Sequence, residues 1–172
     1  MGHIDIITDS EGKKIVIIND LRFKSKRGID WNEVERCLKE YVGKYYEITE
    51  TAEKIYIGSD FPDEFSHSES RKCQMGLNAK AKANMVNAIE YIVINAVNKK
   101  EFPDYQNKHG NKAKYGWYRY DTRFAIPAYS NKGELLKYNV FKTRMLVRHD
   151  ADGKKYLYDF LRINKEDEIQ NK

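Results

Sequence analysis

AKYGWYRYDTRFAIPAYSNKGELLKYNVFKTRMLVRHDADGKKYLYDFLRI, residues 113–163, is dense in tyrosine, arginine and β-branched residues. Its first run, residues 115–126, alternates apolar and polar side chains and stops at Pro127, which has no N–H to donate to a strand ladder. Residues 138–148 and 155–163 alternate in the same way. Because side chains point alternately to the two faces of a strand, this pattern predicts three strands, each with one core face and one polar face.

Two tight-turn signals separate the three runs. Ser130–Gly133 follows the first run, and Asp150–Gly153 follows the second. The glycine of Asp150–Gly153 can adopt the positive φ that a short hairpin loop requires. Consecutive strands joined by such turns pair antiparallel, so we predict a C-terminal three-stranded meander.

The two faces of the predicted meander differ in character. The core face is expected to hold Tyr118, Tyr120, Phe124, Ile126, Phe141, Thr143, Met145, Val147, Leu157, Leu161 and Ile163. The opposite face of the third strand is expected to hold Tyr156, Tyr158, Phe160 and Arg162. That opposite face also gathers five cations beside Asp121, namely Arg119, Arg123, Lys142, Arg144 and Arg148.

A face of this kind has two interpretations. Like charges directly opposed on neighbouring strands repel by up to about 1 kcal/mol per pair, so five cations on one face are more stable with an anion over them. The alternative is an ordinary solvated sheet face, on which lysine and arginine serve only solubility.

The distribution of charge along the chain favours an anionic partner. The whole chain has a formal net charge of +5. Residues 1–70 carry 10 Lys and Arg against 15 Asp and Glu, whereas residues 71–163 carry 19 against 8. A basic segment of net +11 next to an acidic one is typical of proteins that contact nucleic acid.

The chain before the meander predicts two helices and several short strands. Asp30 is followed three residues later by Glu33, a capping signature, and the helix that begins there ends before Gly43. Apolar residues recur at helical spacing from Leu77 to Ala96, which predicts a second helix. Three short apolar runs predict strands at residues 14–18, 45–48 and 54–58.

Together these elements predict an α+β fold, with two main helices packed on an antiparallel sheet that ends in the meander. The 172 residues suit a single domain, 1–172. It consists of an acidic part (1–70), a basic helix plus meander (71–163) and a frayed tail (164–172). Residues 59–67 and 102–114 are polar and read as loops.

Several classes of protein are disfavoured by what the sequence lacks. No apolar run approaches 18 residues, and no basic-then-apolar leader opens the chain, so we expect a cytoplasmic protein without a membrane span. Cys37 and Cys73 have no metal-type spacing and are expected to be reduced thiols. The sequence contains no glycine-rich nucleotide loop, zinc-ligand set or serine elbow, so we expect neither cofactor nor metal.

Further residues are candidates for the same anion-binding surface. Lys80 and Lys82 lie in the first turns of the second predicted helix, where free amides and the helix dipole favour an anion. Tyr120 is an aromatic side chain within the basic run. His67, in an acidic segment, and His149, at a strand end, are candidates for proton transfer. Turn formation and helix capping are the alternative explanation for the carboxylates around His67.

Several runs resemble an uncharacterised domain family of phages and conjugative elements of gut Firmicutes, of the type associated with large polyvalent proteins. The resemblance spans nearly the whole chain. The runs that carry it are Ile18–Asp20, Ile29–Trp31, Tyr56–Glu64, Ala79–Asn84, Lys114–Phe124, Leu146–His149 and Tyr156–Asp159. It implies a protein of a mobile element.

The architecture is also similar to that of the barnase, EndoU, colicin and RelE-like nucleases, in which helices precede an antiparallel sheet with a basic open face. This similarity implies RNA cleavage without a metal, which needs a base, an acid and cations around the phosphate. Arg119 and Arg123 would be catalytic cations, and His67 and His149 the candidates for proton transfer. The chain departs from the pattern because no histidine lies inside a predicted strand of the meander.

Three hypotheses follow for function. The first is a metal-independent endoribonuclease or toxin-like domain, with a possible cognate inhibitor. The second is a non-catalytic nucleic-acid-binding module, with RNA favoured over DNA, that uses Lys80, Lys82, Tyr120, Lys142, Arg144 and Arg148. The third is an anti-defence factor that occupies a host nucleoprotein.

Overall fold

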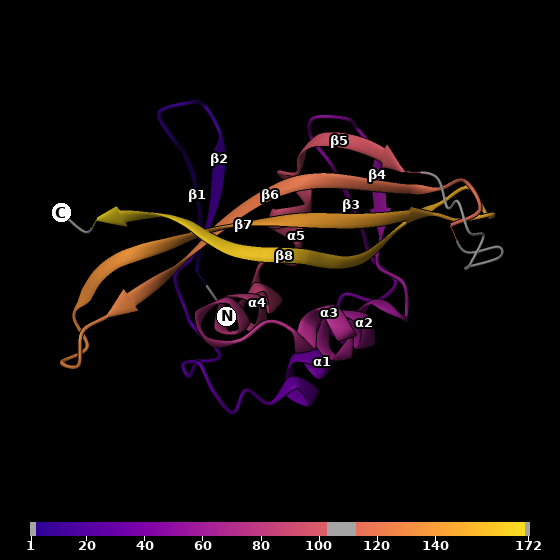
Figure 1. Cartoon of the computed structure of the whole chain (residues 1–172). Coiled ribbons are helices and arrows are strands. Elements are labelled where there is room, and N and C mark those ends of the chain that lie inside the picture. Colours follow the sequence, from indigo (N-terminus) through magenta and orange to yellow (C-terminus); the bar gives the residue numbers. More distant parts are fainter. Residues whose placement is uncertain (1–2, 103–112, 171–172) are drawn as a thin grey trace.

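The computed structural model describes residues 3–102 and 113–170, which form a mixed α+β fold around a strongly curled sheet (Figure 1). The sheet has eight strands. Seven pair in the order β1-β2-β6-β7-β8-β4-β3, and the eighth, β5, pairs with the first half of β6. The strands are β1 (Ile4–Thr8), β2 (Lys14–Ile18), β3 (Tyr45–Glu47), β4 (Lys54–Tyr56), β5 (Val97–Phe102), β6 (Trp117–Tyr129), β7 (Leu135–His149) and β8 (Lys155–Gln170). The helical segments are α1 (Trp31–Lys39), α2 (Phe61–His67), α3 (Glu69–Lys72), α4 (Gly76–Asn84), the 3-10 turn η1 (Met85–Asn87) and α5 (Ile89–Ile94).

The predicted meander is confirmed: β6, β7 and β8 are consecutive antiparallel strands. Two of its expected ends are wrong. β6 continues through Pro127, which lies opposite Tyr138, and this is tolerated because the described β2 pairs only with Phe124 and Ala125 on that side. β8 continues to Gln170, where a frayed tail was expected, because the beginning of β7 supplies it with a pairing partner.

The inner face of the meander forms the core, as the alternation predicted. Of the expected core residues, all but Leu161 are buried. The aromatic rings of Phe124 and Phe141 stack at 5.5 Å, and Tyr120 is fully buried. The segment that covers them includes α5, through Ile89, Ile92 and Val93.

Irregularities in β8 explain why its alternation was predicted less well than that of β6 and β7. The β7–β8 register shifts at three places, and at each one β8 has an extra residue opposite β7. Each extra residue exchanges the faces of the side chains that follow it. Phe160 therefore lies in the core rather than on the polar face, Leu161 turns outward, and Ile163 returns to the core.

The helices differ from the predicted pair. The first is confirmed as α1, whose cap Asp30 accepts hydrogen bonds from the amides of Asn32 and Glu33. The second is divided into α4, η1 and α5. It breaks near Asn84, whose side-chain amide donates to the carbonyl oxygens of Lys80 and Phe23 and so competes with the helical ladder.

Residues 59–67 contain a helix where a loop was expected. Pro62 lies in the first turn of α2, where a missing N–H leaves no helical hydrogen bond unmade. Phe61 and Phe65, one turn apart, bury their rings against Phe160 of β8. Most of the second expected loop, residues 103–112, lies outside the described residues.

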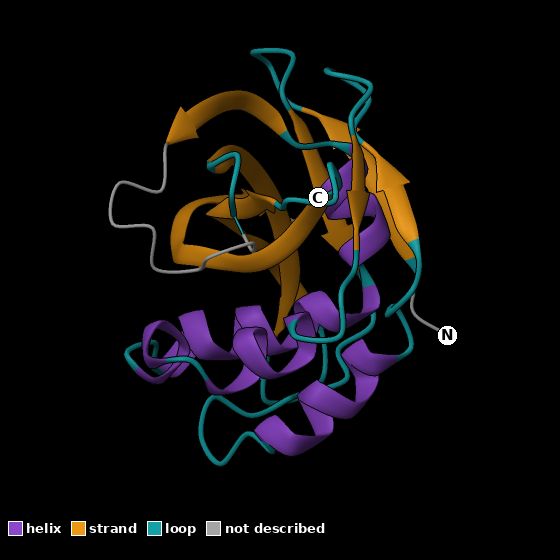
Figure 2. Ribbon diagram, turned by 90° about the vertical axis from the view of Figure 1, so that its right-hand side faces the viewer, coloured by secondary structure: helices purple, strands orange, loops and turns teal. Residues whose placement is uncertain are grey.

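The sheet curls so that the β3–β4 hairpin at one edge approaches β5 at another. Figure 2 shows this curl, with α5 against the sheet and the other helices gathered below it. The predicted strands at 14–18, 45–48 and 54–58 are present as β2 and as the antiparallel pair β3–β4. The backbone of Thr49 donates to Ile94 at 3.0 Å, and that of Asn98 donates to the Glu50 carboxylate at 2.9 Å, so the β3–β4 hairpin is joined to α5 and β5.

A buried ion pair joins the helices to β8. The Lys82 ammonium of α4 contacts the Asp159 carboxylate at 3.0 Å, and both side chains are almost fully buried. Asp159 also accepts hydrogen bonds from the Ser68 hydroxyl and the Phe160 amide, and the ammonium lies 4.5 Å from the centre of the Phe65 ring. Burial lowers the pKa of Lys82 and raises that of Asp159, because an apolar site disfavours each charged form.

We expect Lys82→Met to lower the free energy of unfolding by about 3–5 kcal/mol, since it leaves a buried carboxylate without its cation. Urea denaturation measures the change. Lys72→Met is the matched control, because Lys72 is an exposed lysine paired with Glu69 and should change stability by less than about 1 kcal/mol. Equal losses in the two variants would contradict a structural role for the buried pair.

Candidate nucleic-acid interface

Besides Arg123, the outer face of β6–β8 brings four cations together. Cross-strand pairing sets Arg123 of β6 opposite Lys142 of β7, and Asp121 opposite Arg144. Arg119, Lys142, Arg144 and Arg162 share this face. Burial lowers the pKa of Arg119, and so do the nearby charges of Arg144 and Arg162. The Arg119 guanidinium therefore lies close enough to Arg144 and Arg162 to be repelled by their charges.

Arg162 was not among the predicted site residues, although the alternation of residues 155–163 places it on the polar face. It lies at one of the β8 register shifts and has a φ of 54°, a value that side-chain-bearing residues rarely adopt. Strained backbone of this kind is common next to functional sites, where a bulge redirects a side chain. The alternation of apolar and polar residues in the sequence gives no indication of the unusual φ at Arg162.

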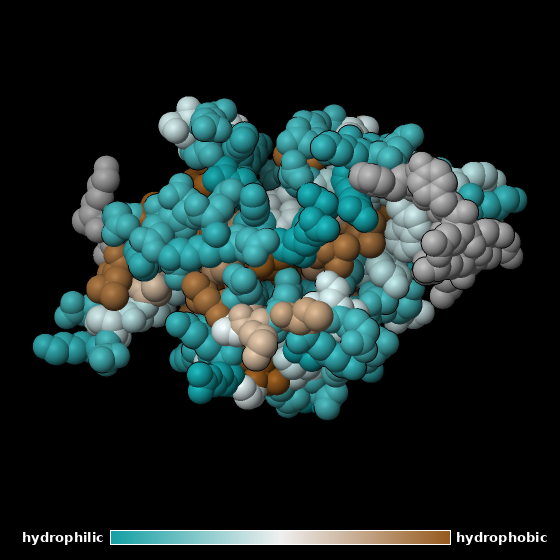
Figure 3. Space-filling model, in the orientation of Figure 1, coloured by the Kyte–Doolittle hydropathy of each residue, from teal (hydrophilic) through white to brown (hydrophobic). Residues whose placement is uncertain are grey.

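A groove runs over this face. Its volume is about 650 Å³. It is lined by residues from the β1–β2 turn and all three strands of the meander: Asp9, Ser10, Glu11, Lys13, Asp121, Thr122, Arg123, Lys142, Thr143, Arg144, Arg162, Asn164, Glu166 and Asp167. The face over β6, β7 and β8 is largely hydrophilic in Figure 3. Cations and carboxylates are equal in number in the lining, so the net charge of the groove is near zero.

Two carboxylates of the groove lie at one end, around Arg123. Its guanidinium contacts Asp9 of the β1–β2 turn and Glu166 of β8, each at 2.5 Å. The bond to Arg123 lowers the pKa of Asp9. Among the described residues, no carboxylate lies within 4.0 Å of Lys142, Arg144 or Arg162. The cationic part of the groove is therefore distinct from the Arg123 end.

Arg148 does not join the open patch, which corrects one expectation. Its side chain is only 5% exposed. The guanidinium contacts Asp60 at the start of α2 and donates to both oxygens of Asp150 at 3.0 and 3.1 Å. It also lies 5.2 Å from the centre of the Tyr156 ring. These contacts give Arg148 a structural role in holding α2 to the sheet.

Three more predicted contact residues lie away from the groove. Tyr120 is fully buried and donates its hydroxyl hydrogen to Glu53 at 2.8 Å. Lys82 is buried with Asp159, so it cannot reach an external phosphate in this conformation. Lys80 borders a separate pocket with Lys24, and its pKa is lowered by burial and by Lys26.

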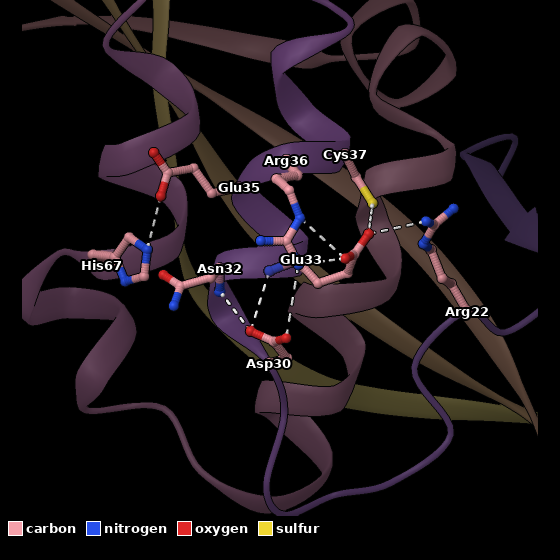
Figure 4. Close-up of polar contacts among 8 residues, drawn as sticks. All are labelled: Arg22, Asp30, Asn32, Glu33, Glu35, Arg36, Cys37 and His67. Atoms are coloured by element: carbon pink, nitrogen blue, oxygen red, sulfur yellow. Dashed lines mark hydrogen bonds and ion pairs between the residues drawn. The ribbon is translucent and has the colours of Figure 1, made fainter.

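His67 lies on the helical side of the molecule, where its Nε2 contacts Glu35 Oε1 of α1 at 3.0 Å (Figure 4). Asp63, one turn earlier on α2, brings a third potential metal ligand, and the three ligand atoms lie within 4.8 Å of one another. This is the group of described residues whose side chains could hold a metal ion. It comes from helices α1 and α2, whereas the four cations come from the outer face of the meander.

The same helix α1 carries a second polar cluster, also drawn in Figure 4. Glu33 accepts from Arg22 at 3.1 Å and from Arg36 at 2.6 Å. The Cys37 thiol contacts the same carboxylate at 3.8 Å, and burial raises its pKa. These contacts connect α1 to the loop before it and do not form part of the basic face.

His149 lies on the inner side of the sheet, in a cluster at the end of the curl. Its Nδ1 contacts the Tyr118 hydroxyl at 2.8 Å. Two ammonium groups, those of Lys99 and Lys155, lie 4.1 and 5.4 Å from the centre of the Tyr118 ring. Both also contact the Glu53 carboxylate, at 2.8 and 2.7 Å. Because Lys99 belongs to β5 and Lys155 to β8, Glu53 connects strands from the two sides of the curl.

The Glu53 contacts predict a pH dependence of stability. Burial opposes ionisation, but hydrogen bonds from Lys155 and Lys99 lower the pKa of Glu53 from 4.5 to about 2. A carboxyl whose pKa is depressed by folding stabilises the fold above its unfolded pKa and loses that contribution as pH falls through its folded pKa. We expect Glu53→Gln to destabilise the protein near neutral pH, and this difference should close between pH 4.5 and about 2. Urea denaturation of both proteins across that range measures it.

Glu11→Gln is a suitable control, since Glu11 is exposed on the β1–β2 turn, where its carboxylate contacts Lys13 at 3.4 Å in an ion pair. Its effect on stability should be small at every pH. If the loss of stability in Glu53→Gln were the same at every pH, the carboxylate would act through its shape and not through its charge.

Comparisons of the chain with protein-family models, with curated proteins and with solved structures find no match. Among the described residues, no helix has both the length and the apolar character needed to cross a membrane.

Proposed function

We propose that the outer face of β6–β8 binds the phosphate backbone of a nucleic acid, with RNA as the favoured partner. The supporting observation is the convergence of Arg119, Arg144 and Arg162 from three strands, with Lys142 on the same face. Guanidinium groups offer two parallel N–H donors that match a phosphate. Burial is the main cause of the lowered pKa of Arg119, and the charges of Arg144 and Arg162 add to it. An anion over this cluster would relieve the repulsion between these charges.

The position of the groove's carboxylates indicates which part of it would hold phosphate. Asp9 and Glu166 are already in contact with Arg123, so that end of the groove is neutralised from within the protein. The cluster of Arg144, Arg162 and Lys142 has no such carboxylate among the described residues. We therefore assign the phosphate contacts to this cluster and a positioning role to Arg123, which holds the β1–β2 turn beside it.

Replacing two cations of the cluster should weaken binding in a salt-dependent way. Each lost phosphate contact reduces the slope of log Kobs against log salt by about 0.7 for a single strand and about 0.9 for a duplex. We expect Arg144→Ala/Arg162→Ala to lose about twice that slope, measured by fluorescence anisotropy with a labelled RNA over a salt series.

Arg36→Ala is the control for lost charge, because Arg36 is an exposed arginine of α1 that is paired with Glu33. Its slope should equal that of the unchanged protein. If Arg36→Ala and a single Arg144→Ala weakened binding equally, the outer face would not be the interface.

The geometry favours binding over cleavage. Cleavage of RNA without a metal requires a base within hydrogen-bond reach of the 2′-hydroxyl while cations hold the phosphate. His67 contacts Glu35 on the helices, and His149 contacts Tyr118 on the inner side of the sheet. Neither imidazole is on the face that carries Arg144 and Arg162.

We therefore expect labelled RNA to remain intact during prolonged incubation with the folded protein in EDTA. Denaturing gel electrophoresis checks this, with the His149→Ala variant run in parallel. Cleavage that disappears in His149→Ala would contradict the binding-only function and assign catalysis to the inner cluster.

A further inference from the structure

Three tyrosines form a row across adjacent strands at the beginning of β8. Tyr45 of β3 is paired with Tyr56 of β4, and Tyr56 is paired with Tyr156 of β8. Their ring centres are 5.3 Å apart for the first pair and 6.1 Å apart for the second. Tyr45 is 51% exposed, and the other two rings are partly exposed.

Each ring of this tyrosine row is accompanied by a cation. The Lys54 ammonium lies 5.4 Å from the centre of the Tyr45 ring, and the Lys154 ammonium lies 5.0 Å from that of Tyr56. Among the described residues, neither lysine has a carboxylate within 4.0 Å. The cation beside Tyr156 is Arg148, which is itself paired with the carboxylates of Asp60 and Asp150.

The tyrosine row lies on the same face of the sheet as the basic cluster. Tyr156 is paired with Arg148 of β7, which is paired with Trp117 of β6. From these positions the same face of β6 and β7 continues to Arg119 and Arg144, because alternate residues of a strand share a face. Arg162 lies six positions after Tyr156 in β8, a separation of at most about 20 Å at the rise of a strand.

We infer that the tyrosine row is a platform on which unpaired bases stack. The ligand of the outer face is then a single-stranded nucleic acid. This inference rests on the proposed function and adds the part of the surface that reads bases rather than phosphates. A base that covers the Tyr45 or Tyr56 ring displaces the lysine ammonium from the ring face, and the lysine is then free to contact the adjacent phosphate. Aromatic rings on a sheet beside a positively charged path are how single strands are bound without sequence preference.

Duplex substrates fit this surface less well. The faces of duplex bases are occupied by their neighbours in the stack, so a tyrosine ring can reach only unstacked bases. A separation of at most about 20 Å between the row and the basic cluster also suits a flexible strand, since single-strand sites commonly span about 4–16 nucleotides. The row therefore discriminates between paired and unpaired partners, whereas the arginine cluster accepts both.

The test compares three labelled probes of equal length: an oligouridine, an abasic strand with the same number of phosphates, and an RNA duplex. Fluorescence anisotropy at one salt concentration gives the affinity for each. We expect the intact protein to prefer oligouridine to the abasic strand. In Tyr45→Leu/Tyr56→Leu that preference should fall by about 5- to 150-fold per lost stacking contact, with abasic binding unchanged.

Tyr129→Leu is the matched control, because Tyr129 is 49% exposed at the end of β6 and is not in the row. It should retain the preference for oligouridine, and circular dichroism should show all variants folded. Equal affinity for oligouridine and the abasic strand, with dependence on Arg144 intact, would overturn the stacking platform and leave the phosphate interface standing. Failure to bind any of the three probes would overturn the proposed function itself.

Discussion

The register of β8 against β7 is the constraint on which the rest of the molecule depends. A strand that paired without interruption would keep Phe160 on the side opposite Leu157. The extra residues of β8 instead place both in the core. The same shifts place Asp159 at the helices, where Lys82 meets it. Core packing and attachment of the helices therefore follow from one irregular ladder.

Ion pairs between the acidic N-terminal part and the basic meander also hold the fold together. Asp9 contacts Arg123, Asp60 contacts Arg148, and Glu53 contacts Lys155. Each pair connects the chain before residue 70 to a strand after residue 113. Much of the charge asymmetry along the sequence thus serves assembly of the fold, and only part of the positive charge is left for an external anion.

The sequence predicts the regular elements well and the irregular ones poorly. Strict alternation in β6 and β7 identifies both strands and their buried faces, and the capping residues around Asp30 identify α1. The division of the second helix depends on Asn84, whose side chain binds the distant backbone of Phe23, and no local pattern encodes that contact. The basic cluster was predicted in part. Arg148 is buried against Asp60, 88 positions away in the sequence, and Arg162, which alternation places on the polar face, has a backbone angle that no local pattern indicates.

The tyrosines of the outer face were visible in the sequence only as residues of three separate runs. Their juxtaposition requires the parallel pairing of β4 with β8, which joins residues about 100 positions apart. Nothing in the composition of either run indicates this contact. Knowledge of the sheet order turns three unremarkable tyrosines into a continuous row.

The three extra residues of β8 also determine where this chain can change in length. Loss of one residue near Arg162 would invert every side chain between it and the next register shift, so Ile163 would face water and Asn164 would face the core. A residue added to the turn at Asp150–Gly153 leaves the pairing of β6 with β7 and of β7 with β8 unchanged. Insertions and deletions among related chains should therefore accumulate at the turns, while the number of residues between Leu157 and Ile163 stays constant.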